Sequence, residues 1–247
     1  YVKMLVDEIR NCPDAVQDYR VVSIFFGGGT PSLLTGEQIG RLMDTVREIF
    51  TLDEDAEITM EMNPGTVTEE KLRRYRQAGV NRLSIGLQSV NDEELRLLGR
   101  IHTYEEFLEA YHLARANGFS NINVDLISAI PGQTVESWRR TLEQVMALSP
   151  EHISAYSLIL EEGTPFYKKY VEDEAKEGPK LPDEDAERQM YWDTETLMEK
   201  NGYHRYEISN YAKEGYACRH NLGYWERIPY LGFGIGAASL VPGELIG

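Results

Sequence analysis

The chain has 247 residues, an ordinary composition for a globular protein and a net charge of −16. So acidic a chain lacks the basic footprint that a phosphate backbone requires, and we expect no nucleic-acid partner. No apolar run is long enough to span a bilayer and no signal-peptide pattern follows Tyr1, so the sequence predicts a cytoplasmic protein. The two cysteines, Cys12 and Cys218, lie far apart and imply no disulfide framework.

Strand-like and helix-like segments alternate along the chain. We expect strands at 21–26, 56–62, 81–88, 121–127 and 152–160. We expect helices at 36–50, 67–78, 91–98, 104–117, 135–147 and 184–200. This alternation predicts βαβ units and a parallel sheet, that is, an α/β fold. The charged stretch 168–187 is interpreted as a solvated loop.

Polar and apolar residues alternate in three of these strands, at 57–63, 82–88 and 121–127. Because helices would cover the apolar face, we expect the polar face to line a barrel interior. Polar groups are costly to bury without partners, so a ligand or a water-filled mouth is expected there. Glu61, Gln88 and Asp125 are predicted to stand at C-terminal strand ends, where β/α barrels place their ligand sites.

The first strand is followed directly by the run Gly27-Gly28-Gly29-Thr30-Pro31. Three glycines remove every Cβ from the turn, so backbone N–H groups can approach a small polar ligand closely. The run lacks the ending of a P-loop and the glycine spacing of a dinucleotide fold. A tight strand-to-helix turn without a ligand remains the alternative.

His220 lies among aromatic residues in the tract 218–225. A histidine beside Tyr224 and Trp225 can ligate a flat, apolar, metal-bearing cofactor. The commoner alternative is a hydrogen-bonded histidine in a partly buried aromatic cluster. Cys12 and Cys218 cannot hold an iron–sulfur cluster by themselves, because such clusters generally need three or four thiolates.

Eight motifs follow one another in a recognisable order, at 27–32, 61–65, 83–89, 98–102, 125–134, 162–165, 206–212 and 220–225. In this order they resemble the oxygen-independent coproporphyrinogen III oxidase-like radical S-adenosylmethionine enzymes, over nearly the whole chain. The resemblance implies a partial (β/α)6 barrel over 1–166 that binds S-adenosylmethionine beside a 4Fe-4S cluster. A linker and the start of an accessory α+β segment, with a heme-binding tract, would occupy 167–247.

The resemblance also implies which residues contact S-adenosylmethionine: Gly27, Gly28, Gly29, Thr30, Glu61, Gln88, Arg100 and Asp125. By analogy, the glycine turn would receive the methionine amino group and Glu61 the ribose hydroxyls. Arg100 would pair with the methionine carboxylate, and Gln88 and Asp125 would complete the contacts.

Within that family, the His-Asn-x-x-Tyr-Trp tract resembles the heme chaperone branch, whose members bind heme and pass it to apoproteins. The resemblance therefore implies that His220 is a heme ligand or heme-site residue. It also implies partners: heme or a porphyrinogen, heme-accepting apoproteins, a small electron donor such as flavodoxin or ferredoxin, and at most transient membrane association. The alternatives are the porphyrinogen decarboxylase itself and a non-catalytic scaffold.

One departure from the family pattern leaves enzymatic activity open. The resemblance expects a Cys-x-x-x-Cys-x-x-Cys loop and a first barrel strand before 21–26, and the given sequence has neither. Tyr1 begins in what looks like the helix after that loop. A fragment of a longer protein and a cluster-less relative are both consistent with this, and the chain alone is expected not to assemble a family-type cluster.

Overall fold

A computed structural model describes residues 1–12, 19–172 and 178–242 of the chain. Seven strands form one sheet in the order β1-β2-β3-β4-β5-β7-β6. The strands are β1 Arg20–Phe26, β2 Thr51–Met62, β3 Arg82–Gln88, β4 Ile122–Ser128, β5 His152–Ser157, β6 His204–Arg205 and β7 Asn210–Ala212. The β1–β2 and β4–β5 pairs are parallel, whereas β7 runs antiparallel to both β5 and β6.

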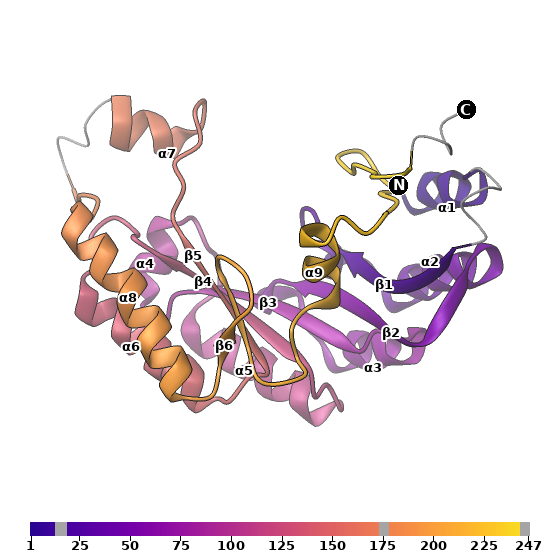
Figure 1. Ribbon diagram of the computed structural model, residues 1–247, viewed down its shortest axis with the longest axis horizontal. Helices are drawn as coiled ribbons and strands as arrows, with labels where there is room; N and C mark the ends of the chain where they lie inside the picture. The colour runs from indigo at the N-terminus through magenta and orange to yellow at the C-terminus, as the bar shows by residue number, and fades with distance from the viewer. Residues whose placement is uncertain (13–18, 173–177, 243–247) are drawn as a thin grey trace. The chain divides into compact units, whose positions relative to one another are not determined.

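Helices separate the parallel strands along the chain, as the sequence predicts for an α/β fold (Figure 1). They are α1 Val2–Arg10, α2 Gly36–Ile49, α3 Glu69–Ala78, α4 Asp92–Leu97, α5 Tyr104–Ala116, α6 Val135–Ala147, α7 Pro165–Tyr167, α8 Glu184–Lys200 and α9 Arg219–Trp225. Short 3-10 turns occupy Pro31–Leu33 and Pro64–Thr66, and a π-helix occupies Lys168–Glu172.

The predicted strands and helices are all present, and their ends differ where strand pairing decides them. Strand β2 begins at Thr51 rather than 56, because Thr51 and Leu52 pair with β1 ahead of a bulge. Strand β5 ends at Ser157 rather than 160, because Ser157 pairs with Ser128, the last residue of β4. The loop expected at 168–187 is wrong in part, because the π-helix and the start of α8 fall inside it; residues 173–177 lie outside the described residues.

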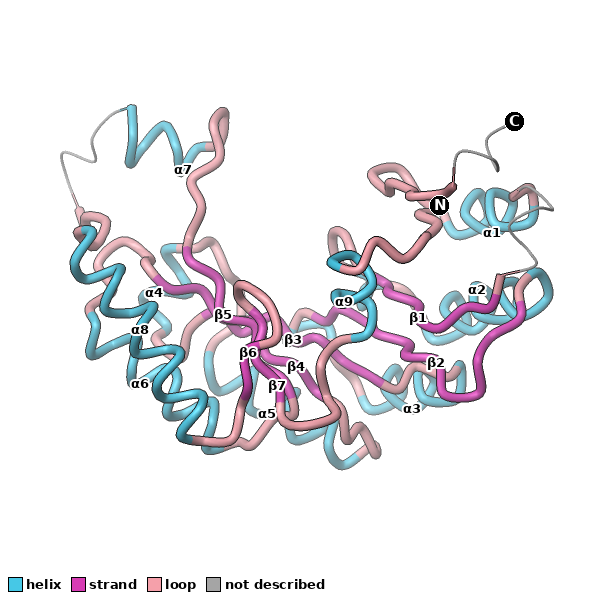
Figure 2. Tube along the Cα trace, in the orientation of Figure 1, coloured by secondary structure: helices cyan, strands magenta, loops and turns pink. Residues whose placement is uncertain are grey.

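The chain forms two compact units, one of residues 1–84, 112–120 and 218–247, the other of 85–111 and 121–217. The domain boundary expected after residue 166 stays a prediction. In the first unit, α2 begins with a capping box. The side chain of Thr35 accepts a hydrogen bond from the backbone of Gln38, and the side chain of Gln38 accepts one from the backbone of Thr35. The segment α9 packs against β1, far from it in sequence (Figure 2).

From Ala56 onward, both faces of β2 are largely buried in the first unit. Ile58 and Met60, on the apolar face, are 5% and 0% exposed. Glu57 and Thr59, on the polar face, are 8% and 0% exposed. The polar interior that the alternation predicts is therefore present, and its burial requires partners for the polar atoms.

In the second unit, α6 and α8 pack through the buried ring of Trp138, whose Nε1 donates to the hydroxyl of Thr194 at 2.9 Å. A second buried polar group lies in α4. The carboxylate of Glu94 accepts hydrogen bonds from three side chains, those of Ser89, Gln133 and Ser137, at 2.6, 2.9 and 2.5 Å. Glu94 thereby ties the end of β3 to the beginning of α6.

We expect Glu94→Ala to lower the free energy of unfolding by about 3 kcal/mol, because the buried Ser89 and Gln133 and the half-buried Ser137 lose their acceptor together. Urea denaturation followed by circular dichroism measures the change. The matched control is Glu93→Ala, one residue earlier and exposed, for which we expect a change below about 0.5 kcal/mol. Equal stabilities of the two variants would contradict the role given to Glu94.

Candidate functional site

The glycine turn after β1 is open and accessible. Gly28 and Gly29 have φ angles of +73° and +88°, which L-residues with a side chain rarely adopt. A Cβ on either would meet nothing within 4 Å, whereas a Cβ on Gly27 would lie 2.8 Å from the ring of Phe25. The turn therefore leaves room for a ligand next to exposed backbone, and Thr30 follows it half-buried.

Glu61 stands beside this turn. Because β1 and β2 are parallel and Phe26 pairs with Met60, the end of β2 reaches the same edge as the turn. The Oε2 atom of Glu61 accepts a hydrogen bond from the backbone N–H of Gly28 at 3.1 Å. The structure thus brings together two of the predicted contacts, a carboxylate and a glycine turn.

The other predicted contacts belong to the second unit. Gln88 ends β3, is 7% exposed and has a φ of +76°, a strained conformation for a residue with a long side chain. Asp125 lies in the middle of β4 rather than at its end, because the strand continues to Ser128 opposite β5, and it accepts a hydrogen bond from Asn123 at 2.8 Å. That Gln88 and Asp125 bind the same ligand as Glu61 stays a prediction.

Arg100 follows α4 and is half-buried. Its backbone N–H donates to the carbonyl of Leu95 at 2.9 Å, which closes the end of that helix. Two residues later, His102 is 3% exposed and its Nε2–H donates to the carbonyl of Leu87 at 3.3 Å. Burial lowers the pKa of His102, and the Arg100 cation lowers it further.

His220 lies in the first unit, on α9. Its ring stacks on Phe25, with centroids 4.9 Å apart and an interplanar angle of 23°. Its Nδ1 lies 3.2 Å from the hydroxyl of Ser23, and its Nε2 lies 3.1 Å from the hydroxyl of Tyr224. Burial lowers the pKa of His220, so the ring is neutral at pH 7.

The start of α9 is held by Glu57, a residue that the sequence analysis placed on the polar face without giving it a role. Its carboxylate accepts from the backbone N–H groups of Arg219 and His220 at 3.1 and 3.2 Å and from the thiol of Cys218 at 3.3 Å. The polar face near Glu57 is therefore satisfied by the chain itself rather than by the ligand or water expected there. Ser23 was also missed, although it interrupts an otherwise apolar strand.

Iron–sulfur ligation does not fit the cysteines that the structure describes. Burial raises the pKa of the Cys218 thiol to about 11, so it remains protonated against Glu57. Among the described residues, no group of three or more His, Cys, Asp or Glu side chains could hold a metal ion. No helix in the same ranges is long and apolar enough to cross a membrane.

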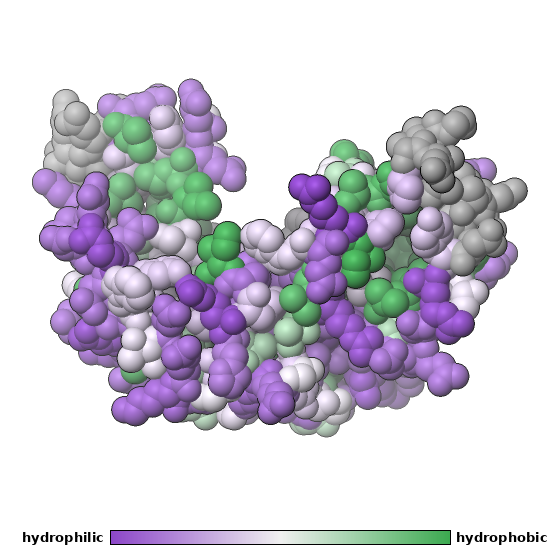
Figure 3. All heavy atoms as spheres, in the orientation of Figure 1, coloured by the Kyte–Doolittle hydropathy of each residue, from purple (hydrophilic) through white to green (hydrophobic). Residues whose placement is uncertain are grey.

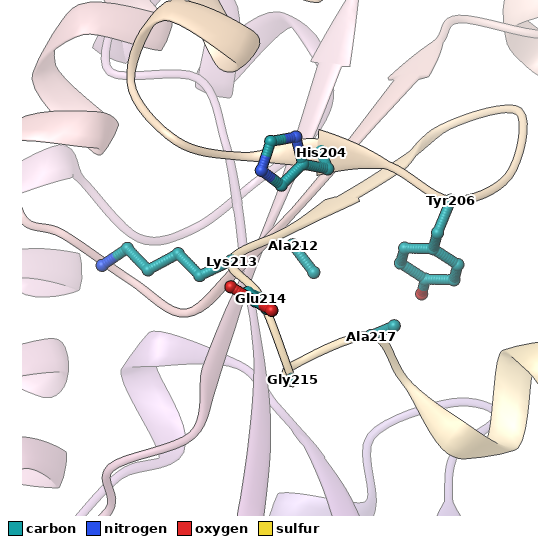
Figure 4. A pocket seen from close by; sticks show the side chains of 7 residues that line it. All are labelled: His204, Tyr206, Ala212, Lys213, Glu214, Gly215 and Ala217. Atoms are coloured by element: carbon teal, nitrogen blue, oxygen red, sulfur yellow. The ribbon is translucent and has the colours of Figure 1, made fainter.

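A pocket of about 480 Å³ lies elsewhere, in the second unit around β6 and β7 (Figure 4). His204, Tyr206, Lys213 and Glu214 contribute its polar side chains. The Lys213 ammonium donates to the carbonyl and hydroxyl of Ser149, at 3.0 and 2.7 Å. None of the residues predicted to bind a cofactor lines this pocket.

Comparison with known proteins gives the class of this protein. Residues 1–145 match the model of the radical SAM superfamily. This chain therefore belongs to the radical SAM superfamily, which implies S-adenosylmethionine and a 4Fe-4S cluster as cofactors. The solved structure of coproporphyrinogen III oxidase (HemN) from Escherichia coli superimposes with a TM-score of 0.80 at 28% identity, over 98% of this chain and 57% of that one. The predicted radical-SAM type of partial β/α barrel is thereby confirmed.

Curated relatives give a narrower likeness. The heme chaperone HemW of Escherichia coli strain K12 is 43% identical over 241 residues, which are 98% of this chain and 62% of that protein. HemW of Haemophilus influenzae is 41% identical over 230 residues, 93% of this chain and 58% of that protein. The chain thus spans about three-fifths of the length of these relatives. The resemblance to the heme chaperone branch, predicted from the tract at His220, is confirmed.

We expect His102 to make stability depend on pH. The pKa of His102 is lowered in the folded protein from its ordinary value of 6.5. Below pH 6.5, His102 is therefore protonated in the unfolded chain to a greater extent than in the folded chain. The free energy of unfolding should therefore fall as the pH decreases below 6.5, with a contribution from His102 approaching about 1.4 kcal/mol per pH unit. Nearby Asp92 and Glu106 oppose the shift, and Arg100 adds to it.

Urea denaturation of the wild type and of His102→Gln between pH 7.5 and about 5.5 measures this dependence. The slope should be smaller in His102→Gln, whatever its stability at pH 7.5. His204→Gln, at an exposed histidine, should keep the wild-type slope. Parallel curves for the wild type and His102→Gln would refute the assignment.

Proposed function

We propose that this chain is the part of a heme chaperone that binds S-adenosylmethionine and presents His220 to heme. The observation that carries the proposal is the identity of 41–43% to HemW heme chaperones over 93–98% of the chain. In this proposal heme is delivered to apoproteins, a small electron donor such as flavodoxin or ferredoxin serves the cluster, and the protein works in the cytoplasm with at most transient membrane contact.

The surroundings of His220 support heme as the ligand. Tyr224 and Trp225 on α9 are 48% and 57% exposed, and Ile228 just beyond the helix is 42% exposed. Figure 3 shows further hydrophobic surface beside α9. Exposed aromatic and aliphatic groups beside a neutral imidazole suit a flat apolar macrocycle whose iron takes a nitrogen ligand.

The residues around α9 therefore fit heme, provided that the hydroxyl of Tyr224 leaves Nε2. Heme, when bound, supplies the iron that an imidazole nitrogen ligates. The chain supplies orientation: Phe25 holds the ring plane, and Glu57 holds the backbone of Arg219 and His220. Trp225, on the same helix, is 57% exposed.

S-adenosylmethionine is proposed to bind at the edge that Gly28 and Glu61 share. An open run of backbone N–H groups and a carboxylate match its ammonium, carboxylate and ribose hydroxyls in chemical type. The proposed contacts are Gly27, Gly28, Gly29, Thr30, Glu61, Gln88, Arg100 and Asp125. Glu57 and Glu61 share one face of β2 and are four residues apart, which is about 13 Å along the strand.

Hemin titration tests the heme half of the proposal. We expect His220→Ala to weaken hemin binding at least about 10-fold and to shift the Soret band, because the iron loses its nitrogen ligand. His204→Ala, at an exposed histidine of the other unit, is the matched control and should bind as the wild type does. Unchanged affinity and an unchanged Soret band in His220→Ala would exclude it as the ligand.

Equilibrium dialysis tests the S-adenosylmethionine half. Glu61→Gln keeps the shape of the side chain and removes its charge, so we expect S-adenosylmethionine binding to weaken about 10-fold, the effect of losing a charged hydrogen bond. Glu54→Gln, exposed on the same strand, should leave binding unchanged. Equal binding by both variants would remove Glu61 from the site.

A second candidate function rests on the structural match to coproporphyrinogen III oxidase. Oxidative decarboxylation of two propionates to vinyl groups would then be the reaction. Incubation of the protein with coproporphyrinogen III under anaerobic, reducing conditions discriminates the two, since formation of protoporphyrinogen IX would favour the oxidase. A non-catalytic scaffold would bind neither ligand, so thermal stabilisation by S-adenosylmethionine or hemin counts against it.

A further inference from the structure

The environment of His220 is built from three elements of the first unit. Ser23 and Phe25 are two residues apart on β1 and so point to the same face, and Ser23 pairs with Glu57 across the parallel ladder. The third element is α9 itself, whose first two N–H groups donate to Glu57. The start of α9 is therefore held to β2 by a single buried carboxylate and to β1 by the contacts of the His220 ring.

The His220 ring is fixed in plane as well as in position. Phe25 stacks against it, and Tyr224 meets it edge-on, with centroids 4.8 Å apart and an interplanar angle of 79°. Tyr224 in turn packs edge-on against Tyr230, at 4.6 Å. A ring packed on two sides cannot flip, which would exchange Nδ1 with Cδ2 and Nε2 with Cε1, without displacing an aromatic neighbour.

Each ring nitrogen then faces one hydroxyl. A neutral imidazole carries a proton on one nitrogen and a lone pair on the other, so one hydroxyl must accept and the other donate. The oxygen of a phenol delocalises its lone pair into the ring, which makes Tyr224 the better donor and Ser23 the better acceptor. The pairing that uses both preferences is Nδ1–H donating to Ser23 and Tyr224 O–H donating to Nε2.

The geometry points to a positioning role for two residues: Ser23 and Tyr224 together hold His220 in the Nδ1-protonated tautomer, so that Nε2 carries the lone pair for iron. This inference rests on the proposed function for its purpose and on the first unit alone for its geometry. Tyr224 covers Nε2 until heme arrives and must then turn away, whereas Ser23 keeps its bond to Nδ1. A hydrogen bond at Nδ1 also increases the basicity of the ligating nitrogen.

The tautomer is measured without heme, by long-range ¹H–¹⁵N NMR of the protein labelled with ¹⁵N-histidine and assigned with His220→Ala. The wild type should show a protonated Nδ1 and an unprotonated Nε2. The double variant Ser23→Ala/Tyr224→Phe should move His220 toward the Nε2-protonated form that free peptides prefer, and Ser23→Thr should retain the wild-type pattern. The exposed His204 serves as internal control in every spectrum.

Hemin affinity supplies the second readout. Tyr224→Phe should bind hemin about 2- to 10-fold more tightly, because no hydrogen bond to Nε2 has to break, and Ser23→Ala should bind more weakly by a similar factor. Ser23→Thr keeps the hydroxyl and should bind hemin with the affinity of the wild type. In the ferrous complex, Ser23→Ala should also lower the iron–histidine stretching frequency seen by resonance Raman spectroscopy.

A protonated Nε2 in the heme-free wild type would overturn the inference. So would hemin affinity in Ser23→Ala equal to that of the wild type, where His220→Ala does weaken binding. Failure of the proposed function is a separate result: the wild type would then not bind hemin through His220, while the NMR pattern could still show the Nδ1-protonated ring.

Discussion

The first unit depends on one buried carboxylate, that of Glu57. It lies on the polar face of β2, 8% exposed, and accepts three hydrogen bonds from residues about 160 positions later in the chain. Because an unpaired buried carboxylate is strongly destabilising, β2 and the start of α9 stabilise one another. The thiol of Cys218 donates a hydrogen bond there and stays protonated, because burial raises its pKa to about 11.

This contact gives the polar face of β1 and β2 two regions with different partners. Ser23, Phe25 and Glu57 are in contact with α9. At the C-terminal ends, Gly28 and Glu61 are joined to each other and leave open backbone around them. Of the polar residues that alternate along β2, Glu57 thus packs against α9, whereas Glu61 belongs to the proposed S-adenosylmethionine site.

Several site residues were predictable because local sequence decides their conformation. The glycine turn follows a buried strand, and positive φ angles are what glycines at such a turn permit. Glu61 could be placed beside it because parallel strands end at a common edge. Asp125 was placed at a strand end and lies in the middle of β4, since the length of β4 is set by its pairing with β5. Strand ends depend on a partner that local sequence does not contain.

By itself, the sequence determined the α/β class, strands β1 to β5, the helices between them and α8, the open glycine turn and the likeness to heme chaperones of the radical SAM superfamily. These follow from periodicity, from turn residues and from motif order, all of which are local. Only the tertiary structure decided that His220 sits between Ser23, Phe25 and Tyr224, and that Glu57 anchors its helix. Those contacts join β1 and β2 to a helix near residue 220, and a hydrogen bond across that separation leaves no periodic trace in the sequence.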